Sequence, residues 1–205
     1  YGRITGTKKK KATKAAIMEA AINLFGERGY ESTSVSALAK AAGIGKGTIY
    51  SYFSSKNEIL LAFCEEELAF IYDEIREKLD PDASLAEKML LVFMSEFRYV
   101  TRNKEFGRTL LREMTFPKEI TIEKSRKIEE RFLELFVKFF KEAQEKGQLR
   151  RDIELIVTGG HLYGLYLMAL SAWYSGRLHT EGDVRESLEL MIEQALAGLT
   201  PPNKS

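Results

Sequence analysis

Hydrophobic residues recur at helical spacing along most of this chain of 205 residues. The first clear stripe at i, i+3, i+4 spacing consists of Ile17, Ala20, Ala21, Leu24 and Phe25. Gly29 lies just past this stripe, where glycine commonly ends a helix because it takes the left-handed conformation without steric cost. No segment alternates between apolar and polar residues over a useful length. The pattern therefore predicts an all-α fold of about nine helices.

A second pattern predicts a helix-turn-helix. Two short amphipathic runs, Val35–Ala42 and Lys46–Phe53, meet at a Gly-Ile-Gly junction. We expect Gly43 to end the first run and Ile44 to turn inward between the two helices. Two short helices joined by a tight turn that contains glycine form a helix-turn-helix. The earlier stripe is expected to pack across the pair and complete a three-helix core.

The second helix of the pair carries polar side chains off its apolar face. Lys46 offers a charge to a phosphate or a guanine edge, and Thr48 offers a hydroxyl and a methyl group to thymine. Gly45 and Gly47 lower helix propensity, but they would also let the backbone approach DNA closely. The predicted DNA-contacting residues are Thr33, Ser34, Ser36, Gly45, Lys46, Gly47, Thr48, Tyr50, Ser51, Tyr52 and Lys56. Helix capping remains the alternative role for the first three, and packing within the small domain for either tyrosine.

These residues carry a family resemblance. Between residues 29 and 60 the chain has, at fixed spacing, Gly-Tyr, Thr-Ser-Val, Leu-Ala, Ala-Gly-Ile-Gly-Lys-Gly-Thr-Ile-Tyr, Phe, Lys and Glu-Ile-Leu. This run resembles the DNA-binding region of TetR-type (tetracycline-repressor-like) regulators, over roughly residues 12–62. The chain departs from the family pattern at Gly45, where serine is common, and at Tyr52, where histidine is common. The operator sequence is therefore not predictable by analogy.

A fourth helix is predicted to leave the small domain. Ser55 and Glu58 have the spacing of a capping box, and apolar residues continue at helical spacing to Leu79, before Asp80-Pro81. Lys56 lies in the first turn, where exposed amide groups favour a phosphate. The resemblance assigns Lys56 the same role.

The remaining sequence predicts a larger helical domain without a motif of its own. The expected helices are Ser84–Thr101, Glu105–Thr115, Ile122–Lys146, Asp152–Tyr174 and Gly182–Ala197. The predicted domain organisation is a disordered basic arm (1–11), a DNA-binding domain (12–58), a ligand-binding and dimerisation domain (59–200) and a tail (201–205).

The segment Leu155–Tyr174 has 20 residues without a formal charge, which is long enough to span a bilayer. We instead expect a helix that is buried on one side by its own domain and on the other by a second subunit. The predicted dimer interface contains Gly160, Gly164, Met168, Val184, Leu188, Met191 and Ile192. The resemblance implies a two-fold dimer through a four-helix bundle, so that two copies bind the two half-sites of a palindrome in double-stranded DNA.

Aromatic and isolated polar residues mark the candidate ligand pocket. The candidates are Phe93, Phe97, Arg98, Phe106, Met114, Phe136, His161 and Tyr166, and plain core packing is the alternative for each aromatic residue. Arg98 would anchor a carboxylate or sulfate, or else pair with a glutamate. His161 would orient a ligand, or else form a hydrogen bond across the dimer.

Charge and composition limit the classes of function that this chain is expected to have. Residues 1–60 hold ten Lys/Arg against four Asp/Glu, whereas the remainder has a balance of −5. A basic head on an acidic body is typical of nucleic-acid binding. Cys64 is the only cysteine, which excludes an intramolecular disulfide and suits the cytoplasm. Two histidines are too few for a typical structural zinc site, and we expect neither a metal nor a cofactor.

We therefore predict a DNA-binding transcriptional regulator, and the resemblance implies a repressor released by a small apolar or amphipathic effector. An enzyme is disfavoured because no catalytic motif or phosphate-binding loop is present. A ligand-independent architectural DNA-binding protein is the remaining alternative. The sequence identifies neither the effector nor the operator.

Overall fold

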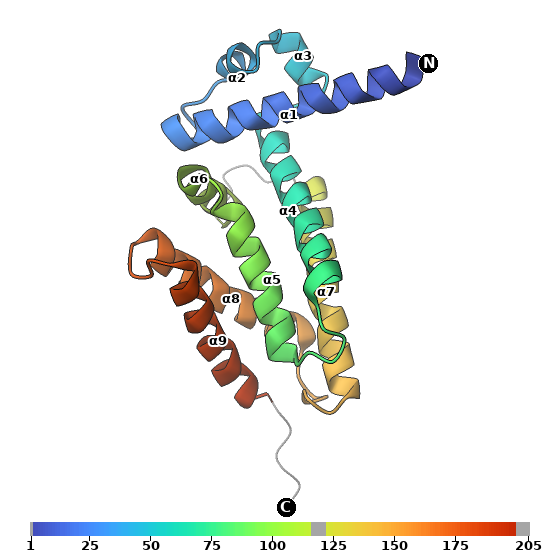
Figure 1. Cartoon of the computed structure of the whole chain (residues 1–205), viewed down its shortest axis with the longest axis vertical. Coiled ribbons are helices and arrows are strands. Elements are labelled where there is room, and N and C mark those ends of the chain that lie inside the picture. The colour runs from blue at the N-terminus through green and yellow to red at the C-terminus, as the bar shows by residue number, and fades with distance from the viewer. Residues whose placement is uncertain (1, 116–121, 200–205) are drawn as a thin grey trace, which may run out of the picture. The chain divides into compact units, whose positions relative to one another are not determined.

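The computed structural model describes residues 2–115 and 122–199, with the side chains of all but residues 2–7, 114, 122–126 and 129. Its described part is all-α and contains nine helices, which confirms the predicted fold class (Figure 1). Each helix predicted beyond residue 80 ends within three residues of its observed bounds. The helices are α1 (Gly2–Arg28), α2 (Val35–Ala41), α3 (Lys46–Tyr50), α4 (Lys56–Lys78), α5 (Leu85–Val100), α6 (Lys104–Thr115), α7 (Ile122–Glu145), α8 (Leu155–Tyr174) and α9 (Glu181–Ala197).

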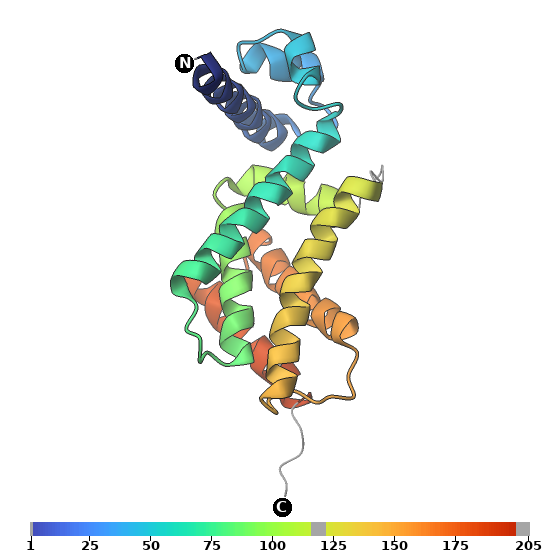
Figure 2. The ribbon, with the colours of Figure 1, turned by 90° about the vertical axis from the view of Figure 1, so that its right-hand side faces the viewer.

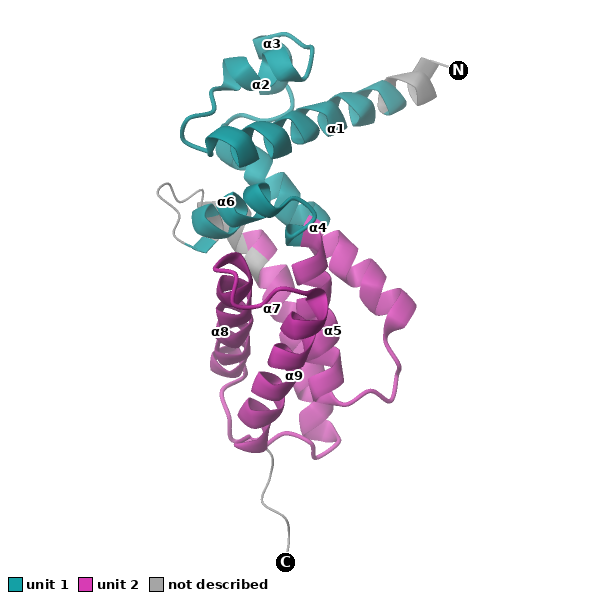
Figure 3. Ribbon diagram, turned by 60° about the vertical axis from the view of Figure 1, so that its left-hand side comes forward, with its two compact units in different colours: residues 1–66, 100–125 teal, residues 67–99, 126–205 magenta. Residues whose placement is uncertain are grey.

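The chain folds into two compact units, coloured separately in Figure 3. The first unit contains residues 1–66 and 100–125, and the second contains residues 67–99 and 126–205. This division differs from the predicted boundary at residues 58 and 59. Helix α4 contributes to both units, and α6 belongs with the DNA-binding helices although it follows α5 in the sequence.

The core of the first unit joins α1 to the helix-turn-helix and to α6. The hydroxyl of Thr109 on α6 donates a hydrogen bond to the carbonyl oxygen of Phe25 at 3.3 Å. The ring of Phe106 packs on that of Phe63 with 4.7 Å between centroids. The apolar core of this unit includes Ile17, Ala21, Phe25, Leu38, Ile49 and Ile59. These contacts bring α6 into a domain that the sequence pattern confines to residues 12–58.

The basic N-terminal segment is helical in the structure. Helix α1 begins at Gly2 and runs through Lys8–Lys11 into the predicted stripe. The prediction of a disordered arm over residues 1–11 is therefore wrong for residues 2–11. Lysine and alanine are good helix formers, so this segment extends the packed helix without needing an apolar face of its own.

In the second unit, polar contacts tie the long helices together around an aromatic core. Figure 2 shows α4, α5 and α7 running alongside one another. The hydroxyl of Tyr72 on α4 donates to the carbonyl of Arg131 on α7 at 3.3 Å. Lys88 on α5 pairs with Glu142 on α7 at 2.9 Å, and its hydrogen bond lowers the pKa of the Glu142 carboxyl.

Helices α8 and α9 pack against each other within this unit (Figure 3). Val184, Leu188 and Ile192 on α9 are fully buried there. The prediction that these three side chains face a partner subunit is therefore wrong, because the apolar stripe of α9 covers its own α8. Gly160, Gly164 and Met168 on α8 are exposed, as a surface between subunits requires, and Met191 is half-buried.

Among the described helices, α8 alone is long and apolar enough to cross a membrane, by length and composition. One third of its apolar window is buried inside the unit. A helix that covers part of a core and exposes the rest to a partner gives the same composition, so this finding alone does not indicate a membrane span.

Candidate DNA interface and ligand site

The turn between α2 and α3 has the predicted geometry. Gly43 takes φ +66°, in the left-handed region, and the amide of Ile44 donates to the carbonyl oxygen of Ala39 at 3.0 Å. Gly45 stands at the N-cap of α3 in extended conformation and offers no side-chain cap. Ile49 is 1% exposed and anchors α3 on the core. This anchor turns the opposite face of α3 to solvent.

The solvent face of α2 and α3 carries most of the predicted DNA-contacting residues. Ser36, Gly45, Lys46, Gly47 and Ser51 are exposed. Tyr50 is 49% exposed, and the ammonium of Lys46 lies 5.9 Å from the centroid of its ring. Thr48 and Tyr52 are half-buried. These side chains form one polar surface beside a fixed apolar anchor, and we call it the α3 surface.

Thr33 has a structural role, unlike its predicted role in DNA contact. Its side chain is buried, and its hydroxyl lies 2.8 Å from the carbonyl oxygen of Gly29 and 3.2 Å from that of Leu24. This hydroxyl is therefore withdrawn from DNA. Ser34 accepts a hydrogen bond from the amide of Ala37 at 3.1 Å and caps α2. The capping alternative is thus observed for Ser34, which remains exposed beside the α3 surface.

Lys56 begins α4 and contacts Tyr30, 26 residues earlier. Its ammonium donates to the Tyr30 carbonyl oxygen at 2.8 Å and lies 4.4 Å from the centroid of the Tyr30 ring. Ser55 caps α4 by accepting from the amide of Glu58 at 3.3 Å. The Glu58 carboxylate accepts from the amide of Ser54 at 2.8 Å. The start of α4 is therefore fixed by side chains of residues that follow α3 closely in the sequence.

Of the predicted pocket residues, four lie in the core of the second unit. The rings of Phe93 and Tyr166 stack with 5.2 Å between centroids. Phe136 lies 5.9 Å from Phe93, and Phe97 packs edge-on against Trp173 at 5.2 Å. Phe106 belongs instead to the first unit, so its assignment to this group is corrected. The side chain of Met114 lies outside the described residues.

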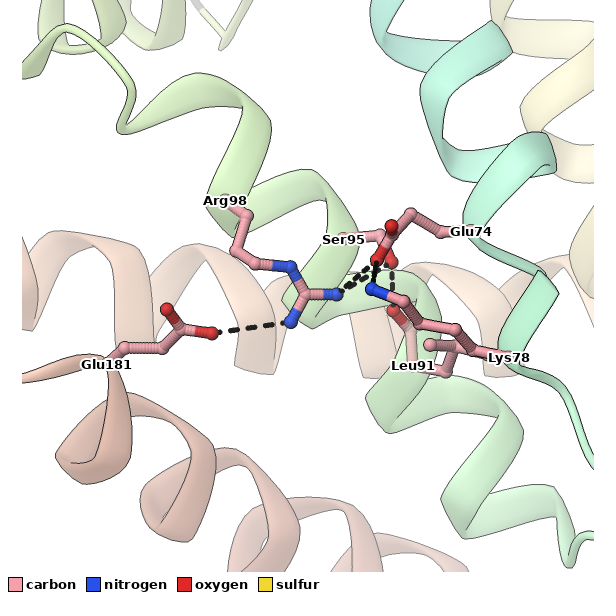
Figure 4. Close-up of polar contacts among 6 residues, drawn as sticks. All are labelled: Glu74, Lys78, Leu91, Ser95, Arg98 and Glu181. Carbon is pink, nitrogen blue, oxygen red and sulfur yellow. Dashed lines mark hydrogen bonds and ion pairs between the residues drawn. The ribbon is translucent and has the colours of Figure 1, made fainter.

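Arg98 is held by glutamates (Figure 4). One guanidinium nitrogen lies 2.7 Å from the Glu74 carboxylate, and the other lies 3.3 Å from that of Glu181. Lys78 also donates to Glu74 at 2.7 Å. The hydrogen bond from Lys78, with that from Arg98, lowers the pKa of the Glu74 carboxyl. The guanidinium is thus engaged within the protein, as the glutamate-pairing alternative predicts, and the ligand-anchor assignment is wrong.

His161 is exposed on α8. Its predicted position in the pocket is therefore wrong, because the side chain points away from the core of its own unit. It lies on the same exposed stripe of α8 as Gly160, Gly164 and Met168. The alternative role across a dimer is the one compatible with this position.

Two glutamates of the second unit that sequence reasoning missed have carboxylate oxygens buried among its apolar side chains. Glu67 on α4 and Glu96 on α5 both have a buried carboxylate oxygen without a hydrogen-bond partner. Burial raises the pKa of Glu67 to about 8. Burial also raises the pKa of Glu96, as does the charge of Glu67, although Tyr163 donates to Glu96 at 3.2 Å. The sequence did contain a signal for Glu96, because it is a charged residue inside the largely apolar run Met89–Phe97.

A separate groove in the second unit is open to solvent. It has a volume of about 530 Å³ and presents apolar side chains from α4 and α7 together with two lysines, Lys88 and Lys138, and two glutamates, Glu134 and Glu142. The described residues contain no group of three or more His, Cys, Asp or Glu side chains that could hold a metal ion.

A helix-turn-helix with an exposed polar second helix defines this chain as a DNA-binding protein. Residues 17–63 match the family model of bacterial regulatory proteins of the tetR family. Residues 17–63 therefore form a TetR-type DNA-binding domain, and the relatives of this chain are transcriptional regulators. This assignment confirms the predicted family and the prediction of a DNA-binding regulator rather than an enzyme.

Relatives extend the likeness beyond the matched domain. The fatty acid metabolism regulator protein of Bacillus subtilis is 24% identical over 169 residues, which are 81% of this chain and 86% of the relative. The repressor KstR2 of Mycobacterium tuberculosis is 31% identical over 84 residues, 41% of this chain and 42% of that protein.

Solved structures agree on the fold. FadR of Bacillus subtilis in complex with stearoyl-CoA superposes with a TM-score of 0.76 at 23% identity, over 90% of this chain and 98% of that one. Thermus thermophilus FadR in complex with lauroyl-CoA superposes with a TM-score of 0.68 at 27% identity, over 93% and 97%.

Proposed function

We propose that this chain represses transcription as a homodimer that binds a palindromic operator and leaves it when a fatty acyl thioester binds. The observation that carries the DNA-binding part is the α3 surface. Buried Ile49 fixes the helix, while Lys46 and Tyr50 point to solvent. A short recognition helix held this way places side chains against base edges in the major groove, and Lys46 and Thr48 supply the groups that distinguish bases.

Homodimer formation is supported by the exposed apolar surface of the second unit. Five large apolar side chains are exposed among the described residues, and four of them lie on α8 or α9: Ile156, Val157, Met168 and Leu190. Val157, Gly164 and Met168 share one stripe of α8, since their spacing returns to the same helix face. A two-fold partner would cover this stripe and present two α3 surfaces to two half-sites.

The acyl thioester class is proposed from the relatives. Two FadR proteins of similar fold were solved with stearoyl-CoA and lauroyl-CoA. The open groove of the second unit has apolar walls such as Ile75 and carries Lys138, whereas its Lys88 is paired with Glu142. An acyl chain is apolar, whereas the phosphates of CoA are anionic. Effector and operator binding would be coupled because the effector favours a DNA-incompetent state.

Selection from random duplexes followed by footprinting tests this function. The proposal predicts one palindromic consensus, bound by two chains, with an affinity about 10³-fold or more above that for scrambled DNA. Binding to all duplexes with little difference in affinity would contradict the proposal and favour an architectural DNA-binding protein.

A further inference from the structure

Among the buried polar atoms of the second unit that lack a hydrogen-bond partner, three belong to residues that influence one another electrostatically. They are one carboxylate oxygen each of Glu67 and Glu96 and the hydroxyl of Tyr166. Glu96 is 6% exposed and Tyr166 is fully buried. A buried polar group without a partner costs free energy, so native proteins rarely leave three together unless something else satisfies them. The three residues come from α4, α5 and α8 and converge on one place.

Within the part of the chain that the structure describes, no basic side chain compensates these acids. Among the described residues, none of the groups that shift the pKa of Glu67, Glu96 or Tyr166 is a lysine, arginine or histidine. Arg98 stands two positions from Glu96, but its guanidinium pairs with Glu74 and Glu181. The positive charge that two buried carboxyls attract is therefore not supplied by their neighbours.

Aromatic rings surround the same place. Phe93 stacks on Tyr166 at 5.2 Å, and Tyr163 lies 5.7 Å from Tyr166 and 6.5 Å from Phe93. The hydroxyl of Tyr163 already donates to Glu96 at 3.2 Å, which joins the rings to the acids. Aromatic faces attract cations through the ring quadrupole, most strongly where water is excluded. We call Glu67, Glu96, Tyr163, Tyr166 and Phe93 the acid–aromatic cluster.

We propose that the acid–aromatic cluster binds the protonated amine of a lipophilic ligand. A primary ammonium group carries three donors and one positive charge. It would give the unpartnered oxygens of Glu67, Glu96 and Tyr166 their missing hydrogen bonds, while the apolar remainder of the ligand packs among the rings. This ligand class is distinct from anionic acyl thioesters, which the two acids disfavour. The inference therefore holds or fails independently of the proposed function.

Calorimetry with head-group analogues tests the inference on the full-length protein. Dodecylamine, dodecanol and dodecanoic acid share one alkyl tail, and each is titrated below the concentration at which it aggregates or separates from water. Charge-assisted hydrogen bonds predict that the amine binds roughly tenfold or more tightly than the alcohol, and that the acid binds most weakly. Equal affinities for amine and alcohol, or tightest binding of the acid, would overturn the inference without any variant.

Variants then test whether the acid–aromatic cluster is the site at which the amine is preferred over the alcohol. The double variant E67Q/E96Q keeps the side-chain shape but cannot become negatively charged when an ammonium group binds, so it should bind amine and alcohol about equally while dodecanol affinity stays unchanged. Glu77→Gln is the matched control, since Glu77 lies on α4 and is exposed, and it should keep the amine preference. If the preference survives in the double variant, the amine binds elsewhere and the assignment to the acid–aromatic cluster is wrong.

Discussion

The ammonium of Lys56 donates a hydrogen bond to the carbonyl oxygen of Tyr30 at 2.8 Å and lies over the Tyr30 ring. The two residues flank the helix-turn-helix in the sequence, so their contact closes a loop around it. Lys56 therefore has two connected roles: it fixes the start of α4 in the first unit, and it keeps a positive charge beside the proposed path of the DNA backbone.

Lys56→Ala should weaken binding to every duplex about equally, because a phosphate contact carries no sequence information. The salt dependence of the affinity should fall by roughly one phosphate contact. Anisotropy titrations of specific and scrambled duplexes at several salt concentrations measure both quantities. Lys56→Arg keeps the charge and should keep the salt dependence. A loss confined to the specific duplex would contradict the positioning role.

Thr48→Ala should change sequence preference more than general affinity, because the substitution removes both a hydroxyl and a thymine-contacting methyl group. Repeating the selection with the variant should relax the consensus at one position in each half-site, with a discrimination loss of about 1–3 kcal/mol. Ser51→Ala is a useful comparison, since its hydroxyl donates to the Thr48 carbonyl at 2.7 Å within α3. An unchanged consensus for Thr48→Ala would remove this residue from the base-contacting set.

Thr33→Val should lower the free energy of unfolding by about 1 kcal/mol while leaving operator affinity unchanged. The substitution keeps the shape of the buried side chain but removes the hydroxyl that lies 2.8 Å from the Gly29 carbonyl oxygen. Urea unfolding and operator titration at a temperature where both proteins are folded separate the two effects. Weaker operator binding at unchanged stability would restore Thr33 to the DNA-contacting residues.

Met168→Glu should convert the proposed dimer to a monomer, because it places a charge at the exposed apolar stripe of α8, where Met168 is 66% exposed. Sedimentation equilibrium measures the mass, and operator titration should show a parallel loss of affinity. Glu145→Lys changes charge at an exposed position on α7 and should remain dimeric. A Met168→Glu protein that stays dimeric would show that subunits associate through another surface.

Protein stability should decrease as pH rises from about 5 to about 8. The pKa of Glu67 is raised from 4.5 to about 8 in the folded protein, so the folded state holds a proton that the unfolded state releases. The stabilisation is complete below the unfolded pKa and is lost as pH passes the folded value, with a slope of at most about 1.4 kcal/mol per pH unit. The raised pKa of Glu96 acts in the same direction.

Urea unfolding at intervals across that pH range should give a flatter profile for Glu67→Gln than for the natural sequence. Glu77→Gln, with an exposed side chain, should follow the natural profile. Parallel profiles for Glu67→Gln and the natural sequence would show that Glu67 is not protonated in the folded state.

The helices and the helix-turn-helix were predictable because their signals are local. Apolar spacing fixes which face of a helix is buried, and Gly43 marks the turn through its left-handed conformation. The buried face of α3 was predictable in the same way, from the apolar side chain of Ile49. Local pattern therefore sufficed to predict which side chains of the α3 surface are exposed. It did not predict the burial of Thr33, because the hydroxyl that could contact a phosphate can also bond to the protein's own backbone.

Contacts between distant segments were not predictable from the pattern. The apolar stripe of α9 fits an intramolecular partner as well as an intermolecular one, so Val184 was assigned to the wrong neighbour. Arg98 and Glu96 stand two residues apart on α5, yet one pairs with acids from α4 and α9 while the other is buried without a base. Which charge finds a partner depends on helices brought together only by the fold.

The proposal of a ligand-released repressor is tested most directly by one titration. The selected operator duplex is labelled, half-saturated with protein at its dissociation constant, and titrated with palmitoyl-CoA while anisotropy is followed. CoA alone and palmitate serve as controls. We expect palmitoyl-CoA to lower operator affinity at least about tenfold, as coupling of 1–3 kcal/mol between two sites implies, and the controls to have little effect. Unchanged operator affinity at saturating palmitoyl-CoA would contradict the account.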